Sequence, residues 1–330
     1  MKDLNFEFSR SPLQTSIIFL NKPQMNLEAD LILIDSRVSS IYRSILPDGV
    51  EAVEIPGGEQ AKTPETLHEL WRRMAGANIH RDSRMVVIGG GTLCDVGAFA
   101  ASTWKRGIHL TLVPTTLLGM VDASLGGKTA VNIGRQKNQA GTVYPAERIL
   151  LWTGFLETLP EEELKNGMAE ALKTAVIGNR GILESLKTED YNEAVRQCLK
   201  VKGEIVTEDI EEKGSRKLLN LGHTAGHCIE AASNFSIPHG LAVAMGIPVA
   251  ARMGGCMSFA DEFEEAADSI GIETRIPGSI TAEEAMLHLS ADKKTVSTGR
   301  TWIIPVNWEH CKMVALVPEE EKKLLMESWR

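Results

Sequence analysis

Residues 84–102 read RMVVIGGGTLCDVGAFAAS, an apolar β-branched run that leads into three glycines and then into a segment of small residues. A glycine run between a strand and a helix lets the backbone approach a pyrophosphate, whose negative charge is favoured by the helix N-terminus. The spacing is not GxGxxG, and a tight turn without any ligand uses glycine as well. The stretch therefore predicts a strand-turn-helix unit of a sheet, with either a nucleotide or only a tight turn at residues 89–91.

Apolar runs of the same kind recur through the first 150 residues and are separated by helical stretches; they cover residues 16–20, 31–34, 52–55, 109–113 and 148–151. Such runs are typical of a parallel sheet covered by helices on both faces. Beyond residue 157 the pattern turns helical, over residues 161–177, 191–212, 224–232, 241–257 and 282–289. The sequence predicts an α/β protein with two domains: an N-terminal, doubly wound, mostly parallel nucleotide-binding sheet in residues 1–157 and a C-terminal, mainly α-helical domain in residues 158–330.

The composition is that of an ordinary globular chain: of 330 residues, 43% are hydrophobic and 24% are charged, which excludes a disordered or collagenous protein. The formal net charge of −9 argues against nucleic-acid and anionic-membrane partners, but it leaves room for a local basic pocket. Five scattered cysteines without a CxxC pair indicate a reducing compartment. The longest early apolar run, residues 17–20, is too short for a signal or membrane segment, so we expect a cytoplasmic protein.

Two further loops follow predicted strands at the same carboxyl edge of the sheet. Residues 56–62, PGGEQAK, carry Glu59 and Lys62, and the segment VPTTL carries the hydroxyls of Thr115 and Thr116. Open α/β sheets bind ligands at this edge. A solvated turn and an ordinary helix start are the competing interpretations of the two loops.

A glycine-rich segment with lysines, VDASLGGKTAVN at residues 121–132, comes next. It lacks the first glycine of a P-loop, which makes an ATPase a poor interpretation. The residues instead suggest a clamp for a small anion, built from Lys128, Lys137, Asn132 or Asn138, and Arg106. Isolated lysines are usually surface residues, so this hypothesis depends on their clustering with glycines.

In the helical half, Glu170 and Lys173 share a helix face, where a surface ion pair is the simpler interpretation. The segment around His223 and His227 is harder to explain in this way, because glycines precede both histidines and a third, His239, follows at a helix start. Three of the eight histidines thus fall within 17 positions. From residue chemistry alone we expect zinc, held by two or three of these histidines and one carboxylate, with a position open to substrate.

Five long segments carry a specific resemblance: GGGTLCDVGAFAASTWKRG, VPTTLLGMVDASLGGKTAVN, GMAEALK, LNLGHTAGHCIE and PHG. Together they resemble the 3-dehydroquinate synthase family of the sugar-phosphate cyclases, whose wider fold group includes iron-containing alcohol dehydrogenases and glycerol-1-phosphate dehydrogenase. The resemblance extends from Asp35 to Lys294, almost the whole chain. It implies a dehydroquinate synthase-like fold whose C-terminal domain binds a metal.

The resemblance places the metal ligands, for zinc or cobalt, at Glu170, His223 and His239, and it makes His227 a substrate contact, unlike the spacing argument. It implies an NAD site formed by Asp35, Glu59, Lys62, Gly90, Gly91, Asp95, Thr115, Thr116, Phe155 and Thr158. It implies substrate contacts by Arg106, Asp122, Lys128, Lys137, Asn138, Lys173, Arg216, Asn220, His227, Lys293 and Lys294. The chain carries the expected residue type at each of these positions, so an intact catalyst is implied.

The implied reaction converts 3-deoxy-D-arabino-heptulosonate 7-phosphate, a small anionic phosphosugar, to 3-dehydroquinate and phosphate in the shikimate pathway of aromatic amino acid biosynthesis. Transient oxidation by NAD, β-elimination of phosphate, re-reduction and an intramolecular aldol step make up the expected cycle, in a homodimer. Two positions depart from the family pattern: Leu241 stands where Glu is usual, and Tyr144 where Gln is usual. The alternatives are another sugar-phosphate cyclase, a metal-dependent polyol or glycerol-phosphate dehydrogenase of the same fold, and a catalytically silent NAD-binding regulator.

Overall fold

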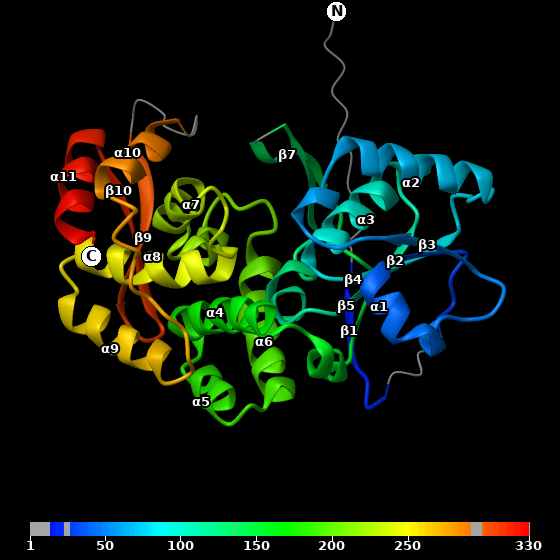
Figure 1. Ribbon diagram of the computed structural model, residues 1–330, viewed down its shortest axis with the longest axis horizontal. Helices are drawn as coiled ribbons and strands as arrows, with labels where there is room; N and C mark the ends of the chain where they lie inside the picture. Colours follow the sequence, from blue (N-terminus) through cyan, green and yellow to red (C-terminus); the bar gives the residue numbers. More distant parts are fainter. Residues whose placement is uncertain (1–13, 23–26, 135, 292–298, 330) are drawn as a thin grey trace, which may run out of the picture.

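The computed structural model describes residues 14–22, 27–134, 136–291 and 299–329, and Figure 1 shows them as two units side by side. The N-terminal unit is built on a parallel sheet, and the C-terminal unit consists mostly of helices. This arrangement confirms the predicted α/β fold class. Within the described residues, no helix combines the length and the apolar character needed to cross a membrane.

Six parallel strands form the sheet in the order β1-β8-β5-β4-β2-β3. Each apolar run singled out in the sequence is one of these strands: β1 (Ser16–Phe19), β2 (Leu31–Asp35), β3 (Glu51–Ile55), β4 (Arg84–Gly89), β5 (His109–Pro114) and β8 (Arg148–Leu151). The strands β2 and β4 are buried along almost their whole length. Their continuous apolar sequence explains why they occupy the interior of the sheet.

The strand order reverses between β2 and β4. From β2 the chain runs to β3 at one edge, and it then returns to β4 on the other side of β2. Ile34 is paired with Ile88, so the residues that follow them, Asp35 and Gly89, lie at the same end of the sheet. Ligands of doubly wound sheets bind in the crevice at such a switch point. The fold therefore places the glycine run where a nucleotide is expected.

Three helices accompany the sheet: α1 (Ser36–Ile41), α2 (Pro64–Gly76) and α3 (Gly91–Thr103). Helix α2 begins where its sequence favours a start, because Thr63 caps it and Pro64 occupies its first turn. Helix α3 is largely buried and contacts β4 and β5. A Cβ atom at Gly97 would come within 2.5 Å of the Val87 side chain, so glycine permits this close packing.

An antiparallel hairpin of β6 (Lys128–Ile133) and β7 (Gln136–Val143) was absent from the sequence prediction. Most side chains of β7 are exposed, so the segment lacks the apolar run that identifies the other strands. The hairpin contacts α3 and extends beyond the sheet between the two units (Figure 1). It carries residues of the N-terminal unit toward the C-terminal unit.

The C-terminal unit contains the helices α4 (Glu161–Gly178), α5 (Gly181–Lys187), α6 (Tyr191–Glu208), α7 (His223–Ala232), α8 (His239–Met253), α9 (Met257–Asp268), α10 (Ala282–Ala291) and α11 (Pro318–Ser328). The five predicted helices correspond to α4, α6, α7, α8 and α10, but two of them end early. Helix α6 ends at Glu208 rather than at residue 212, and α8 ends at Met253, before two glycines, rather than at residue 257. The buried helix α8 contacts α4, α7 and α9.

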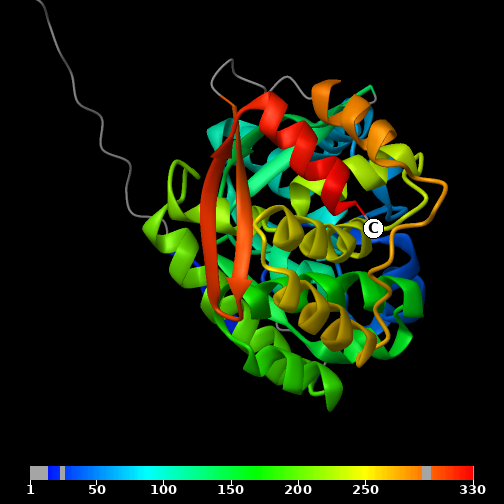
Figure 2. The ribbon, with the colours of Figure 1, turned by 90° about the vertical axis from the view of Figure 1, so that its left-hand side faces the viewer.

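A second hairpin, β9 (Arg300–Asn307) and β10 (His310–Leu316), was also not predicted, and Figure 2 shows it along one side of the helices. Between the units, a 3₁₀ segment covers Thr153–Thr158, and Pro160 precedes α4. The domain boundary between residues 157 and 158 falls inside that segment and stays a prediction.

Candidate active site

Three expected metal ligands meet where α4, α7 and α8 converge. Glu170 lies in the middle of α4, while His223 and His239 are the first residues of α7 and α8. The Nε2 atoms of His223 and His239 lie 3.9 and 3.7 Å from Glu170 Oε1. Gly222 has a φ of 75°, and a Cβ atom at this position would lie 2.5 Å from the Val243 carbonyl oxygen. A glycine here therefore allows α7 to start in close contact with α8. The structure thus brings together three potential ligands whose donor atoms lie within 4.8 Å of one another.

Both histidines are oriented through their other ring nitrogen. The Nδ1 atom of His223 lies 3.1 Å from the Leu221 carbonyl oxygen, and the Nδ1 atom of His239 lies 3.1 Å from Glu230 Oε2. A hydrogen bond donated by Nδ1 leaves Nε2 with a free lone pair, which is the usual arrangement of histidine ligands. In both residues that lone pair belongs to the nitrogen nearest Glu170.

Glu170 supports the interpretation of this cluster as a cation site. Its side chain is 1% exposed, and within the described residues Oε1 has no hydrogen-bond partner. Its other oxygen, Oε2, lies 2.6 Å from the buried ammonium of Lys173. A buried carboxylate oxygen without a partner is costly, and a divalent cation would satisfy it. One carboxylate and two imidazoles suit zinc or a similar ion and leave a coordination position open.

The charges around the cluster favour the ligand form of His223. Burial lowers the pKa of His223, and the neighbouring Lys173 ammonium lowers it further. At neutral pH the ring is therefore uncharged, which is the form that binds metals.

A pocket of about 1510 Å³ lies between the two units and ends near this cluster, with His239 in its wall. Eight of the ten residues expected to bind NAD line it: Asp35, Glu59, Gly90, Gly91, Thr115, Thr116, Phe155 and Thr158. Gly90 precedes α3 and provides no side-chain cap, so no capping side chain occupies the first N–H groups of that helix at the pocket. This arrangement suits a pyrophosphate at the helix N-terminus.

The other two expected NAD residues, Lys62 and Asp95, form an ion pair with 2.5 Å between Nζ and Oδ2. Neither is among the residues that line the pocket. Burial raises the pKa of Asp95 in spite of the nearby lysine.

At the pocket itself, Asp35 Oδ1 accepts a hydrogen bond from the Arg37 amide at 2.8 Å, and a Cβ at Gly57 would lie 2.0 Å from Asp35 Oδ2. Glycine at position 57 therefore leaves room for the carboxylate.

A second pocket, of about 660 Å³, has His223 in its wall and also contains the expected substrate residues Lys128, Asn220 and His227. Glu212, which the sequence interpretation missed, bridges two of them. Its Oε2 pairs with Lys128, and its Oε1 accepts a hydrogen bond from Asn220 at 2.5 Å. Burial alone would raise the pKa of Glu212, but these two contacts outweigh it and lower the pKa.

Two further cationic side chains, those of Lys202 and Arg216, are buried and interact electrostatically with Asp122. Lys202 Nζ lies 2.6 Å from Asp122 Oδ1. Burial alone would raise the pKa of Asp122, but the charges of Lys202 and Lys173 outweigh it and hold the pKa below its ordinary 3.8. The guanidinium of Arg216 donates to the carbonyls of Ile210 and Gly126 at 2.6 and 3.0 Å. Lys202 was missed, because a lysine on a long helix gives no signal in the sequence.

The β6-β7 hairpin links the first pocket to α7. Lys137 Nζ lies 2.8 Å from Glu230 Oε1, while the Asn138 amide donates to Asn132 Oδ1 at 2.8 Å. Asn132 in turn donates to Glu59 Oε1 at 2.7 Å. Burial raises the pKa of Glu230, but the hydrogen bond from His239 and the charge of Lys137 outweigh it and bring the pKa to about 2.

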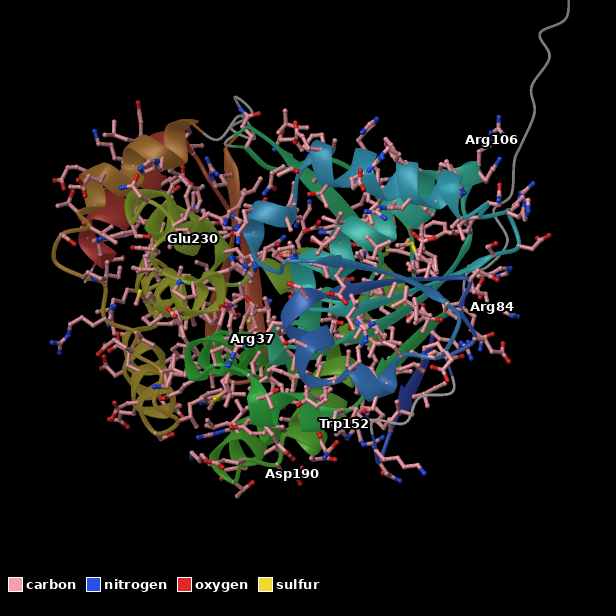
Figure 3. All side chains as sticks on the ribbon, turned by 45° about the vertical axis from the view of Figure 1, so that its right-hand side comes forward. Arg37, Arg84, Arg106, Trp152, Asp190 and Glu230 are labelled. Atoms are coloured by element: carbon pink, nitrogen blue, oxygen red, sulfur yellow. The ribbon has the colours of Figure 1, made fainter. Side chains whose placement is uncertain are left out.

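Some expected substrate residues are not brought to these pockets. Arg106 is exposed and does not line either pocket among the described residues, and Figure 3 shows it at the opposite end of the N-terminal unit from Glu230. Its role as a substrate contact stays a prediction. Lys293 and Lys294 lie outside the described residues.

The two departures from the family pattern have structural surroundings of their own. Leu241 packs against the hydrophobic core, and Tyr144 donates a hydrogen bond to the Ile108 carbonyl at 2.8 Å. Neither is among the residues that line the two pockets. They therefore leave the described parts of the site intact.

The fold and the site define a protein that joins a nucleotide-binding α/β domain to a helical domain with a Glu-His-His cation site. A family model described as 3-dehydroquinate synthase N-terminal matches residues 52–166, and one described as 3-dehydroquinate synthase C-terminal matches residues 167–295. A 3-dehydroquinate synthase of Thermococcus kodakarensis is 39% identical over 289 residues, which are 86% of this chain and 84% of that protein. One from Synechococcus is 33% identical, covering 84% and 81%. The chain belongs to the 3-dehydroquinate synthase family.

Solved structures support the same assignment of fold. A 2-epi-5-epi-valiolone synthase of Streptomyces hygroscopicus, solved with NAD⁺ and Zn²⁺, superposes with a TM-score of 0.86 at 24% identity, covering 97% of this chain and 98% of that one. A 2-deoxy-scyllo-inosose synthase, solved with carbaglucose-6-phosphate, NAD⁺ and Co²⁺, gives 0.80 at 26% identity and 91% coverage of both chains. Sugar-phosphate cyclases thus share the fold of this chain.

Proposed function

We propose that this enzyme is a 3-dehydroquinate synthase, a carbon-oxygen lyase that converts 3-deoxy-D-arabino-heptulosonate 7-phosphate to 3-dehydroquinate and phosphate. One observation carries the proposal beyond family membership: each of the two pockets has a potential ligand of the same cation site in its wall. His239 lines the nucleotide pocket, and His223 lines the pocket that holds Lys128 and Asn220. A substrate at the cation site would therefore lie close to both the cofactor pocket and the anion-binding side chains.

NAD⁺ and a divalent metal complete this site in the proposal. The residues that line the first pocket would hold NAD⁺, and Glu170, His223 and His239 would hold the metal, for which we propose zinc, with cobalt as a substitute. When bound, the cofactor takes up and returns a hydride, and the metal polarises substrate oxygens. The 2-deoxy-scyllo-inosose synthase complex, which contains NAD⁺, Co²⁺ and a sugar-phosphate analogue, supports this pair of cofactors.

The chain's own residues bind the anionic groups of the substrate. Lys128 and Asn220 both contact the carboxylate of Glu212, which demonstrates that their donors converge on one anionic group. The buried Arg216, which interacts electrostatically with Glu212, adds positive charge there. A phosphosugar that takes the place of the Glu212 carboxylate would meet these donors, which is how a chain of net charge −9 would bind an anion.

His227 supplies a titratable group at the substrate side of the site. Its ring lies in the wall of the second pocket, with its centroid 5.5 Å from that of His223 and 5.8 Å from that of His239. We assign it the role of holding or moving a proton on the bound substrate, since neutral imidazole is the usual side chain for this task near pH 7.

The proposal also includes a homodimer in the cytoplasm. The dimer is supported by the family resemblance. The compartment is supported by the five scattered cysteines, which include no CxxC pair. The finer division of the chain into residues 1–157 and 158–330 belongs to the same proposal.

A comparison of substrates tests the proposed reaction. The purified enzyme, supplied with NAD⁺ and zinc, is incubated with 3-deoxy-D-arabino-heptulosonate 7-phosphate or with glucose 6-phosphate. We expect phosphate and 3-dehydroquinate from the first substrate and neither product from the second. Phosphate release from glucose 6-phosphate alone would assign the enzyme to a different cyclase reaction.

A further inference from the structure

Glu230, on α7, is a buried carboxylate that is neither an expected metal ligand nor an expected substrate contact. Its side chain is 4% exposed, and both oxygens are engaged. Oε2 lies 3.1 Å from His239 Nδ1, and Oε1 lies 2.8 Å from Lys137 Nζ. One carboxylate therefore connects a potential metal ligand of the C-terminal unit with a lysine of the β6-β7 hairpin.

His239 needs such an anchor more than the other histidine ligand. The side chain of His239 is 33% exposed, against 17% for His223, so packing restricts His239 less. His223 is also anchored by a backbone carbonyl, that of Leu221, whereas His239 relies on the side chain of Glu230. The contact from Glu230 holds Nδ1 and leaves Nε2 of His239 3.7 Å from Glu170 Oε1.

Lys137 connects this pair to the nucleotide pocket. Its ammonium lies 4.6 Å above the ring of Phe235, and Lys137, Phe235, Glu230 and His239 all line the same pocket. The hairpin that carries Lys137 also holds Asn132, which donates to Glu59 on the other side of that pocket. The position of the hairpin is thus linked to the orientation of His239 through a single buried carboxylate.

A second metal site is the competing interpretation, because donor atoms of His227, Glu230 and His239 also lie within 4.8 Å of one another. The contacts of Glu230 argue against it. One carboxylate oxygen already faces an ammonium at 2.8 Å, and the other faces the ring nitrogen that a second ion would have to share. A further cation would compete with Lys137 for the same charge.

We propose that Glu230 is a positioning residue that fixes His239 for metal binding and ties this ligand to Lys137 of the hairpin. The inference rests on the metal-dependent function proposed above. Carboxylates that hold the second nitrogen of a histidine ligand raise its basicity and fix its orientation, and losing one lowers metal affinity about 10–100-fold.

The test measures the affinity of the metal-free protein for Co²⁺ and Zn²⁺ by competition with a chromogenic chelator, in the absence of substrate and NAD⁺. In Glu230→Gln, one neutral amide oxygen has to serve both His239 and Lys137, so we expect the affinity to fall about 10–100-fold. Adding Lys137→Met removes the competing donor and should restore part of the affinity. A residue that only supports the fold would show no such rescue.

Glu321→Gln is the matched control. Glu321 is another buried glutamate, 5% exposed, paired with Arg300 and accepting a hydrogen bond from Trp302, but it has no contact with the three ligands. We expect Glu321→Gln to lower the melting temperature and to leave metal affinity at the wild-type value. Together, the two variants separate an effect on the cation site from a general loss of stability.

Wild-type metal affinity in Glu230→Gln overturns the proposal, as does the absence of rescue by Lys137→Met. Binding of two ions by the wild type and one by Glu230→Gln would make Glu230 a ligand instead. If Glu230→Gln does not fold, Glu230→Asp takes its place, since its shorter side chain cannot reach both partners and should lower the affinity as well. Because the assay contains no substrate, its result is independent of whether the proposed reaction is correct.

Discussion

Replacing Lys173 by methionine separates the structural and the metal-binding roles of the cation site. Lys173 Nζ lies 2.6 Å from Glu170 Oε2, and the two side chains are 2% and 1% exposed. In the metal-free protein, Lys173→Met leaves a buried carboxylate without a counter-charge, which costs about 3–5 kcal/mol. For a unit of this size, that lowers the melting temperature by about 6–20 °C.

A divalent metal should reverse much of this loss. The bound ion supplies the positive charge that Glu170 has lost, so the rise in melting temperature on adding Co²⁺ should be larger in Lys173→Met than in the wild type. Lys187→Met is the matched control. Lys187 pairs with Glu184 at the same spacing of three residues, but the side chains are 37% and 68% exposed, so we expect a loss of only about 0–1 kcal/mol.

The assay is thermal unfolding followed by circular dichroism, first with a chelator and then with increasing Co²⁺. The prediction requires a large loss of stability without metal and a larger recovery with it. A metal-free Lys173→Met that melts at the wild-type temperature would refute the argument that Lys173 compensates a buried charge on Glu170. An equal metal-induced shift in both proteins would refute the assignment of Glu170 to the cation site.

Three further predictions concern single residues. His239→Ala should lose bound metal while His227→Ala keeps it, and equal metal content in His239→Ala and wild type would contradict the ligand assignment. Lys128→Ala should lower kcat/KM roughly tens-fold or more, from a loss of about 2–5 kcal/mol, at nearly unchanged melting temperature; a near-normal kcat/KM would exclude a role in substrate binding. Because the pKa of Asp122 is lowered in the folded protein, its pair with Lys202 stabilises above pH 3.8 and is lost as the pH falls below that value. Urea unfolding at several pH values should therefore show that Asp122→Asn loses less stability on acidification than the wild type, and parallel losses would contradict this.

The sheet was predictable because each of its strands is a recognisable apolar run in the sequence. Residues such as Leu31 and Val86, in the interior of the sheet, have almost no exposure, and the pattern they belong to is visible without any tertiary information. The β6-β7 hairpin was not predictable in this way, since β7 is mostly exposed and its pairing depends on the neighbouring strand. The β9-β10 hairpin was missed for a similar reason, because most side chains of β10 are exposed or partly exposed.

The candidate site divides along similar lines. Glycine runs and clustered histidines are unusual in sequence, and they pointed to the residues that the fold brings together around His223 and His239. Lys202, Glu212 and Glu230 gave no such signal, because each is an ordinary charged residue whose partner lies far away in the chain. Only the packing of α6 and α7 and the position of the hairpin bring them to the site. The sequence therefore identified the histidines and the glycine turns, whereas the charged partners Lys202, Glu212 and Glu230 were identified only from the tertiary structure.

Phosphate released per NAD⁺ supplied is the measurement that bears most directly on the proposed reaction. In the proposed cycle the cofactor is oxidant and reductant in turn, so it returns to its starting state after each turnover. With zinc bound and NAD⁺ supplied in an amount below that of the substrate, the enzyme should release many phosphates per NAD⁺ from 3-deoxy-D-arabino-heptulosonate 7-phosphate, without accumulation of NADH absorbance. One NADH accumulating for each substrate consumed would contradict the proposal and identify a dehydrogenase of the same fold. Phosphate release that stops when the NAD⁺ is used up would contradict the return of the cofactor to its starting state.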